Sequence, residues 1–267
     1  MYASSFRYAR ATSIAEAERL FAASNDASYL SGGMTLIPTM KLRLAAPEDV
    51  IDLNAIPGLA FARCNGDTLQ IGAHTRHADV ADSEEVKRSL PALACLASMI
   101  GDPSVRHRGT LGGSIANNDP AADYPAAIVA LKANVKTSKR EIPGEKFFTG
   151  MFSTALEGGE IVTSVEFQIP SRAGYAKFPN PASRYAVVGV FVADFLGTIR
   201  VAVTGAGPCV FRQEEMERTL AMDFTPTAAK NVEVSAEGLN SDLHASNKYR
   251  AHLINIMAAH AVEAALV

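Results

Sequence analysis

The most distinctive stretch of the 267-residue chain is Ile100-Gly-Asp-Pro-Ser-Val-Arg-His-Arg-Gly-Thr110-Leu-Gly-Gly-Ser-Ile-Ala-Asn-Asn-Asp-Pro-Ala-Ala-Asp123-Tyr-Pro125. It is rich in Gly, Asn, Asp and Pro and has few apolar residues. The composition of residues 101–123 therefore predicts a long loop, ordered or disordered, and long ordered loops often carry function. At its end, residues 124–131 are predicted to form a buried helix.

A second glycine pair lies near the N-terminus, in Ser31-Gly32-Gly33-Met34-Thr35. It matches the pair in Thr110-Leu111-Gly112-Gly113-Ser114. Adjacent glycines allow positive φ and let a ligand approach the main chain, whose N–H groups can then bind phosphate oxygens. Neither stretch is a P-loop or a GxGxxG fingerprint. Each alone is also compatible with an ordinary tight turn, but two of them suit a ligand with two phosphates.

Other polar residues of the same region have two interpretations each. Asp119-Pro120 is typical of a helix start, with Asp as N-cap and Pro in the first turn. Asp123 would then lie in that first turn, or would accept hydrogen bonds from ligand hydroxyls. The Arg106-His107-Arg108 cluster could neutralise a pyrophosphate or form a solvated turn. His74 and His77 have a spacing that a metal site could use, but no matching ligands accompany them, so we expect no metal site.

The composition excludes several classes of protein. The formal net charge is −3 and the hydrophobic fraction is 48%, which is typical of a globular chain. There is no basic block for nucleic acid or for a membrane surface, and no apolar run of membrane-spanning length. The N-terminus lacks the apolar region of a signal peptide. Cys64, Cys95 and Cys209 form no disulfide or iron–sulfur pattern, so we expect a cytoplasmic protein.

Hydrophobic periodicity and turn signals predict a mixed α+β chain. A helix is expected over residues 14–21 behind Thr12-Ser13, and Thr35 is expected to cap the next one. A hairpin is expected around Asn65-Gly66-Asp67, and residues 170–174 are a candidate linker. The remaining expected helices cover residues 91–99, 212–222, 227–232 and 244–266, and the remaining expected strands cover 28–31, 50–53, 59–61, 69–71, 161–169, 187–195 and 198–203.

Taken together, these motifs resemble those of the medium, FAD-binding subunits of molybdenum hydroxylases, such as carbon monoxide dehydrogenase, xanthine dehydrogenase and aldehyde oxidase. Residues 31–44 resemble the first flavin motif of that family, and residues 100–125 resemble the second, longer one. Residues 50–53, 147–156 and 181–186 match further family stretches. The resemblance covers nearly the whole chain and weakens after about residue 210.

The resemblance implies a fold of the vanillyl-alcohol-oxidase/PCMH type. Two α+β FAD-binding subdomains, residues 1–57 and 58–172, would be followed by a C-terminal α+β domain, residues 173–267. The cofactor would be FAD, bound between the two subdomains.

The resemblance also assigns roles to residues. The two glycine turns would hold the FAD pyrophosphate, and Asp123 would contact ribityl or ribose hydroxyls. Ile161 and Val162 would make a backbone contact to the flavin or adenine end, and Tyr185 would lie near the isoalloxazine. Members often carry a polar residue at the position of Met34, so that side-chain contact would be lost here. The expected cofactor-binding residues are Ser31, Gly32, Gly33, Met34, Thr35, Thr110, Leu111, Gly112, Gly113, Ser114, Asn117, Asp123, Ile161, Val162 and Tyr185, with no catalytic residue and no metal ligand among them.

The resemblance further implies a split enzyme, because three scattered cysteines cannot supply the four ligands of a two-iron cluster. A small [2Fe–2S] subunit and a large molybdenum-cofactor subunit would accompany the chain, as a dimer of heterotrimers. The chain would pass their electrons through FAD to NAD or another acceptor. Two alternatives stay open: a self-sufficient flavin-dependent oxidoreductase of the vanillyl-alcohol oxidase superfamily, and a non-redox scaffold that has lost FAD.

Overall fold

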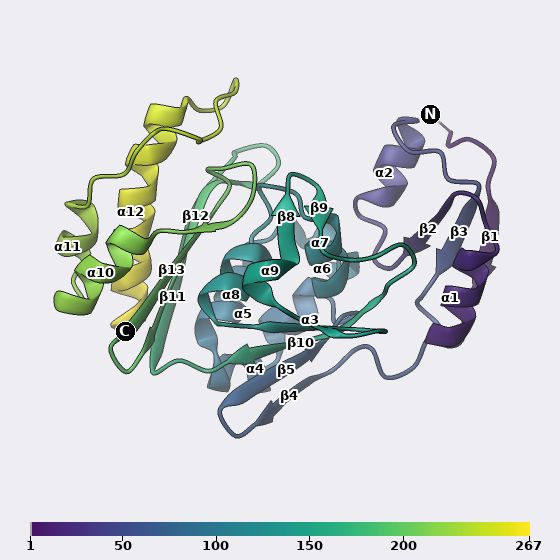
Figure 1. The fold of residues 1–267 in the computed structure, drawn as a ribbon, viewed down its shortest axis with the longest axis horizontal. Coiled ribbons are helices and arrows are strands. Elements are labelled where there is room, and N and C mark those ends of the chain that lie inside the picture. Colours follow the sequence, from purple (N-terminus) through teal and green to yellow (C-terminus); the bar gives the residue numbers. More distant parts are fainter. Residues whose placement is uncertain (1) are drawn as a thin grey trace.

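The computed structural model describes residues 2–267 and arranges them in three units along the long axis of the molecule (Figure 1). Each unit is built around one of three larger sheets, of three, five and four strands. Two further short strands pair with each other in a small two-stranded sheet. The mixed α+β class predicted from the sequence is confirmed. The division at residues 57/58 and 172/173 stays a prediction.

The first unit is a three-stranded parallel sheet in the order β1-β3-β2, with one helix after β1 and one after β2. The predicted helix 14–21 is confirmed: the Ser13 hydroxyl caps it by accepting from the Glu16 N–H. A Glu16 carboxylate oxygen reaches back to the Thr12 N–H at 2.8 Å. The elements are β1 (Arg7–Arg10), α1 (Ile14–Ala22), β2 (Ala27–Leu30), α2 (Leu36–Lys41) and β3 (Asp49–Asp52).

The second unit is a five-stranded antiparallel sheet in the order β4-β5-β10-β6-β7, packed against a cluster of short helices. The predicted turn around Gly66 is confirmed, with φ +65° at that glycine. The first hairpin strand comes later than predicted, at 62–65 instead of 59–61. The elements are β4 (Ala62–Asn65), β5 (Thr68–Gly72), α3 (His77–Asp82), α4 (Glu84–Ser89), α5 (Pro91–Ser98), α6 (Pro103–Arg108), α7 (Leu111–Asn117), α8 (Tyr124–Ala130), β6 (Asn134–Thr137), β7 (Glu141–Pro143), α9 (Gly144–Phe147), β8 (Phe148–Gly150), β9 (Ser153–Thr154) and β10 (Val162–Gln168).

The long loop predicted over 101–123 is wrong in its first part, because α6 and α7 occupy it. Asp102 caps α6 by accepting from the Val105 N–H, and Thr110 caps α7 by accepting from the Gly113 N–H. The predicted helix start at Asp119-Pro120 is also wrong. There Asp119 Oδ1 accepts from the Ala121 N–H at 2.9 Å, which closes an Asx turn, and the helix begins only at α8.

The third unit is a four-stranded antiparallel sheet in the order β11-β12-β13-β14, covered on its outer face by α12 (Figure 1). Residues 170–174 are not a linker, since β11 begins at Arg172. A Cβ added to Gly174 would lie 1.9 Å from the Ala261 carbonyl oxygen of α12. The elements are β11 (Arg172–Pro179), β12 (Ala186–Phe195), β13 (Thr198–Thr204), β14 (Phe211–Arg212), α10 (Glu214–Met222), α11 (Pro226–Lys230) and α12 (Asn247–Ala265).

The third sheet is buried on both faces, which joins it to the second unit. Val190 and Val192 face the core beneath α12, whereas Phe191 and Ala193 belong to the core of the second unit. Side chains of a strand alternate between the two faces of its sheet. The second unit and the sheet of the third therefore share a hydrophobic core.

Among residues 2–267 no helix is both long and apolar enough to cross a bilayer.

Candidate functional site

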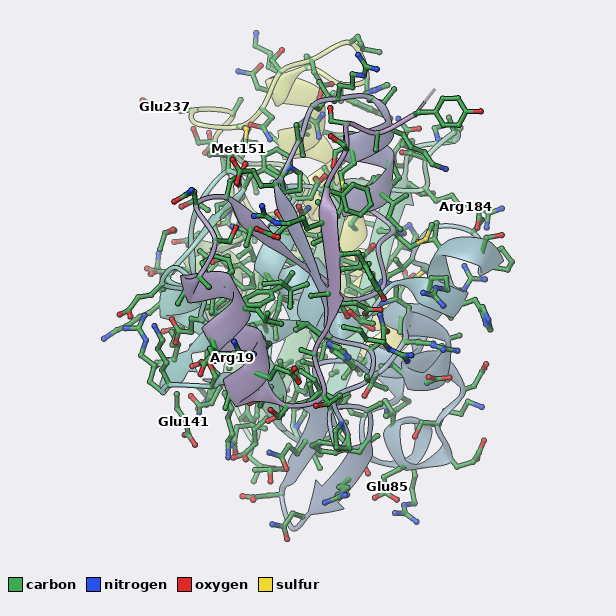
Figure 2. The ribbon with its side chains drawn as sticks, turned by 90° about the vertical axis from the view of Figure 1, so that its right-hand side faces the viewer. Arg19, Glu85, Glu141, Met151, Arg184 and Glu237 are labelled. Atoms are coloured by element: carbon green, nitrogen blue, oxygen red, sulfur yellow. The ribbon has the colours of Figure 1, made fainter. Side chains whose placement is uncertain are left out.

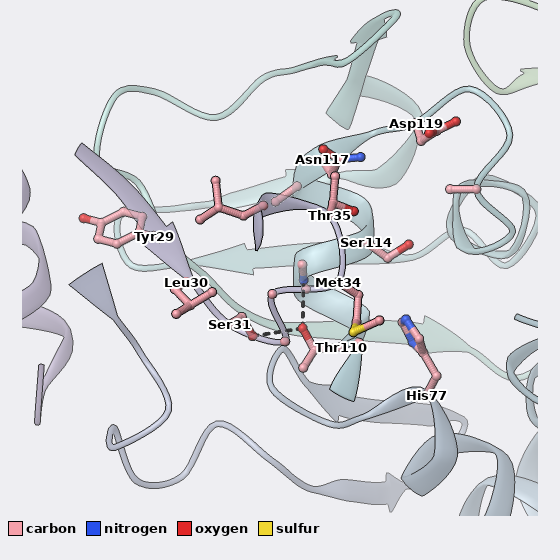
Figure 3. A pocket seen from close by; sticks show the side chains of 18 of the residues that line it. Tyr29, Leu30, Ser31, Met34, Thr35, His77, Thr110, Ser114, Asn117 and Asp119 are labelled. Atoms are coloured by element: carbon pink, nitrogen blue, oxygen red, sulfur yellow. Dashed lines mark hydrogen bonds between the residues drawn. The ribbon is translucent and has the colours of Figure 1, made fainter. Parts of the chain in front are cut away.

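The two glycine motifs meet in space, although 79 residues separate their hydroxyl-bearing members. Ser31 Oγ and Thr110 Oγ1 lie 3.0 Å apart and share a hydrogen bond (Figure 3). Beside them, a Cβ added to Gly32 would lie 2.2 Å from the Arg108 carbonyl oxygen and 2.8 Å from the Gly109 Cα. Only a glycine allows this approach of two backbones, so the motifs join the first unit directly to the second.

The first motif presents a row of unused main-chain donors. Gly33 adopts φ +75°, and α2 begins three residues later. Across the described residues 2–267, the N–H groups of residues 32–35 find no hydrogen-bond acceptor. The Thr35 hydroxyl, predicted to cap α2, makes no capping bond. Consecutive N–H groups at a helix start are a common anion-binding arrangement.

The sequence predicts a turn at the second motif. In the structure its residues instead form the start of helix α7. Its amides are engaged inside the protein: the Leu111 N–H donates to the Thr75 carbonyl at 3.1 Å, and the Gly112 N–H donates to the Ala73 carbonyl at 2.8 Å. The Gly113 N–H donates to Thr110 Oγ1 at 3.1 Å. A Cβ added to Gly113 would lie 2.9 Å from Thr110 Oγ1 and 4.0 Å from the Ser31 Cβ. This motif therefore supplies a small, close wall instead of a second row of donors.

A cavity of about 650 Å³ opens where these segments meet. Every predicted cofactor-binding residue lines it except Leu111, which is fully buried in the core of the second unit. The Met34 side chain, whose exposed fraction is 36%, also lines it. Arg106, His107 and Arg108 do not line it; Arg106 instead donates to the carbonyls of Ile100 and Gly101. The two glycine motifs, although far apart in the sequence, therefore line the same cavity.

Asp123 lies in the cavity wall with one carboxylate oxygen already used. Its Oδ1 accepts from the Tyr175 hydroxyl at 2.5 Å and from Lys177 Nζ at 2.8 Å. Burial raises the pKa of this carboxyl, and the Lys177 ammonium opposes the rise. In the described residues 2–267 the side-chain groups that bind this carboxylate are both on Oδ1, which leaves Oδ2 to accept from a ligand hydroxyl. Tyr175 and Lys177 were not predicted, because nothing local in β11 marks them as partners of Asp123, which lies 52 positions before Tyr175.

The loop that carries Tyr185 is held in place by polar contacts. The Asn180 N–H donates to the Tyr185 carbonyl at 2.8 Å, and Lys177 Nζ donates to the Arg184 carbonyl at 2.9 Å. Lys177 therefore links this loop to Asp123. Burial raises the pKa of the Tyr185 phenol, with a further contribution from Asp119. Viewed from the side of the first sheet, Arg184 lies on the outer surface of the molecule, away from α1 and its Arg19 (Figure 2).

Leu156, Ile161 and Val162 contribute apolar side chains to the lining of the cavity. The Ile161 N–H donates to Ser138 Oγ at 3.2 Å, and its carbonyl accepts from the Ser138 N–H at 2.8 Å. Both main-chain groups of Ile161 therefore have a partner within the protein, and Ile161 and Val162 both line the cavity. The predicted backbone contact of these two residues to the flavin or adenine end stays a prediction. Neighbouring Glu160 also lines the cavity. Burial alone would raise its pKa, but hydrogen bonds from Arg140, Glu157 and Thr137 outweigh it and lower the pKa to about 2.

His74 and His77 both line the cavity, which the sequence did not predict. Burial lowers the pKa of each. In the part of the chain that the structure describes, no three His, Cys, Asp or Glu side chains are grouped as a metal site would require.

The family model described as "FAD binding domain in molybdopterin dehydrogenase" matches residues 4–171, which carry both glycine motifs and Asp123. The chain belongs to this family. The resemblance noted in the sequence is confirmed, and so is FAD as the cofactor of the family site.

Relatives of this FAD-binding family match the chain over nearly its full length. The nicotine 6-hydroxylase medium subunit of Paenarthrobacter nicotinovorans is 35% identical, with 93% of each chain covered. The carbon monoxide dehydrogenase medium chain of Hydrogenophaga pseudoflava is also 35% identical, covering 97% of this chain and 96% of the relative. A chain of quinoline 2-oxidoreductase from Pseudomonas putida 86 superimposes with a TM-score of 0.90 at 26% identity, covering 100% and 99% of the two chains. The predicted fold class is confirmed by this likeness.

The residues of the cavity fit FAD. The N–H groups of residues 32–35 suit a pyrophosphate, and the free Asp123 Oδ2 suits a hydroxyl. Apolar side chains at Ile161 and an aromatic ring at Tyr185 suit the flat, largely apolar ends of the cofactor.

Proposed function

We propose that this chain is the FAD-binding electron-transfer subunit of a molybdenum-containing hydroxylase or dehydrogenase. The observation that carries the proposal is the joining of the two flavin motifs, by the Ser31–Thr110 hydrogen bond, around a single cavity. In this proposal a small [2Fe–2S] subunit delivers electrons from a large molybdenum subunit, and NAD or another acceptor takes them up. When bound, FAD supplies the conversion between two-electron and one-electron transfer.

The chain's own residues bind and orient the cofactor. Gly32, Gly33, Met34 and Thr35 would donate main-chain N–H groups to the pyrophosphate, and Ser114 and Asn117 lie nearby in the wall. Asp123 would accept a hydroxyl through Oδ2 while Lys177 and Tyr175 hold Oδ1. Tyr185 would cover the ring end of the cavity. No side chain is assigned a proton-transfer role, because the substrate would be oxidised in another subunit.

Identifying the bound cofactor tests this assignment. The chain is purified, its cofactor is released by heat, and the product is separated by chromatography. We expect FAD in a near one-to-one ratio with protein. Recovery of FMN alone, or of no flavin from protein refolded in excess FAD, would contradict the proposal.

The partnership needs a separate test. The nicotine 6-hydroxylase and carbon monoxide dehydrogenase relatives are named as medium subunits. We propose that this chain likewise assembles with the two partner subunits as a dimer of heterotrimers. An obligate assembly of this kind buries more than roughly 2,000 Å² in total. Co-expression of a tagged chain with neighbouring reading frames, followed by affinity purification, should recover both partners. The isolated chain should not oxidise aldehydes or purines; turnover by the chain alone would favour the self-sufficient flavoenzyme instead.

A further inference from the structure

The carbonyl group of Ser31, at the start of the first glycine motif, is held by a side chain from outside the cavity lining. Asn54 follows strand β3, and its Nδ2 donates to the Ser31 carbonyl oxygen at 2.9 Å. Asn54 lies 23 positions further along the chain and does not line the cavity itself. The N–H groups of residues 32–35 come directly after this carbonyl. Asn54 therefore supports the turn that is expected to bind the pyrophosphate, without lining the space for the ligand.

Asp52 fixes the orientation of the Asn54 side chain. Its Oδ1 accepts from Asn54 Nδ2 at 2.6 Å and from the Asn54 main-chain N–H at 2.9 Å. Its Oδ2 accepts from the Tyr8 hydroxyl at 2.6 Å. Burial alone would raise the pKa of Asp52, but hydrogen bonds from Tyr8 and Asn54 outweigh it and lower the pKa, so the carboxylate is charged at neutral pH. Because Asn54 Nδ2 faces a carboxylate and a carbonyl, both of which only accept, the amide fits in one orientation.

Ser31 is also tied to a side chain of the second unit. Its hydroxyl shares a hydrogen bond with Thr110 Oγ1 at 3.0 Å (Figure 3). Asn54 thus holds the main chain of Ser31 from the first unit, while Thr110 holds its side chain from the second. These two contacts set where the turn begins, and the turn then continues through Gly33, with φ +75°, into α2.

The turn benefits from this support because its own donors are idle. In the described residues 2–267 the N–H groups of residues 32–35 have no acceptor, so no hydrogen bond made through them fixes their direction. A segment that is already ordered loses less conformational entropy when its ligand binds. A contact that orders the turn in advance therefore adds to the affinity for the ligand without touching it.

We propose that Asn54 is a positioning residue of the FAD site. By holding the Ser31 carbonyl, it arranges the N–H groups of residues 32–35 for the pyrophosphate before the cofactor binds. Asp52 orients the Asn54 amide, and Asn54 does not itself touch the cofactor. This inference rests on the proposed function, since it needs a chain that binds FAD.

The test uses the full chain freed of flavin, with Asn54→Ala as the variant and Asn240→Ala as its matched control. Asn240 Nδ2 likewise donates to a main-chain carbonyl, that of Gly207, at 2.7 Å, and Asn240 lies in the third unit outside the cavity lining. Dissociation constants for FAD are measured by quenching of flavin fluorescence. The order of residues 32–35 in the flavin-free chain is measured by NMR relaxation of their backbone amides.

We expect Asn54→Ala to weaken FAD binding about three- to ten-fold, as for the loss of one hydrogen bond. In the flavin-free variant the backbone order parameters of residues 32–35 should fall from roughly 0.85, typical of a rigid backbone, to below about 0.6. Asn240→Ala should leave both the FAD affinity and these order parameters unchanged, because it removes the same kind of bond far from the turn.

Equal FAD affinity in the wild type and Asn54→Ala would overturn the inference. So would a loss of affinity with unchanged order in residues 32–35, or an equal loss in Asn240→Ala, which indicates general destabilisation. Should Asn54→Ala fail to fold, Asn54→Asp, which has a similar size but no amide donor, takes its place with the same expectations. A wild-type chain that binds no FAD would instead refute the proposed function itself.

Discussion

At the scale of single residues, the two glycine pairs have different roles despite their similar sequences. Gly33 has φ +75°, whereas Gly113 lies within α7 and has no positive φ. Gly32 and Gly112 are required because a Cβ would clash with a neighbouring segment. The clash would be with Arg108 and Gly109 for Gly32, and with Ala73 for Gly112. The sequence predicts that both pairs belong to the site. It does not reveal these different reasons, because they depend on which backbone lies opposite.

Substitution of Gly33 separates backbone strain from cofactor binding. Gly33→Val should cost about 1–3 kcal/mol of stability through its left-handed backbone and should abolish FAD binding, because the row of N–H groups is displaced. Gly58→Val is the matched control: Gly58 has φ +78°, with no atom within 4 Å of an added Cβ, and lies outside the cavity. It should lose similar stability and keep its FAD affinity. Chemical denaturation and flavin fluorescence measure the two effects; FAD retained by Gly33→Val would contradict the phosphate assignment.

The buried pair of Asp123 and Lys177 allows a second prediction. Their side chains are 4% and 3% exposed. Asp123→Asn should destabilise the protein by about 3–5 kcal/mol, since it leaves the Lys177 ammonium buried without its counter-charge. Adding Lys177→Met should restore much of this stability, as shown by thermal unfolding, while FAD affinity stays low because the hydroxyl acceptor is altered. If the double variant binds FAD like the wild type, Asp123 does not contact the cofactor.

At the scale of elements, the chain contains the same dipeptide signal twice, at Asp102-Pro103 and at Asp119-Pro120. The prediction placed a helix start at the second, whereas the structure has one at the first. Local sequence does not distinguish them. The Pro120 carbonyl accepts from the Gly205 N–H at 2.8 Å and from the Thr204 hydroxyl at 3.2 Å, so strand β13 fixes the second segment as a turn. Other elements were predictable because their signals are local. Helix α1 has a clear cap and periodicity, and strands β12 and β13 are joined by a glycine turn at Gly197.

Asn118 holds the hairpin of β8 and β9 against the end of α7. It is buried in the left-handed conformation, with φ +44°, and its side-chain amide donates to the carbonyls of Gly150 and Ser153 at 2.8 and 2.7 Å. The main-chain carbonyl of Asn118 accepts from the Phe152 N–H at 3.1 Å. Asn118→Ala should therefore cost about 2–4 kcal/mol, the sum of two lost bonds and an unfavourable φ. Hydrogen exchange should accelerate in residues 148–154 specifically. Unchanged exchange there would mean that the strands hold the hairpin by themselves.

At the scale of the whole molecule, the shared core predicts how the protein unfolds. Strand β12 contributes Phe191 to the core of the second unit and Val190 to the core under α12. We expect residues 58–267 to unfold in one cooperative transition, because neither core can open without exposing the same strand. Calorimetry of the intact chain, with hydrogen exchange to locate each transition, measures this. A separate early transition confined to residues 173–267 would show that the C-terminal region is an independent domain.

The contact of Gly32 with the Arg108–Gly109 backbone also constrains how the gene can change. Every glycine codon has the form GGN, and any missense change of its first or second base gives Ala, Val, Asp, Glu, Ser, Cys, Arg or Trp, all of which carry a Cβ. With 2.2 Å between that Cβ and a carbonyl oxygen, none of these fits without moving a main chain. Only third-position changes are silent at this codon. In a deep mutational scan selected for holoenzyme, position 32 should therefore tolerate no amino-acid replacement, whereas position 58, with open space around it, should tolerate several.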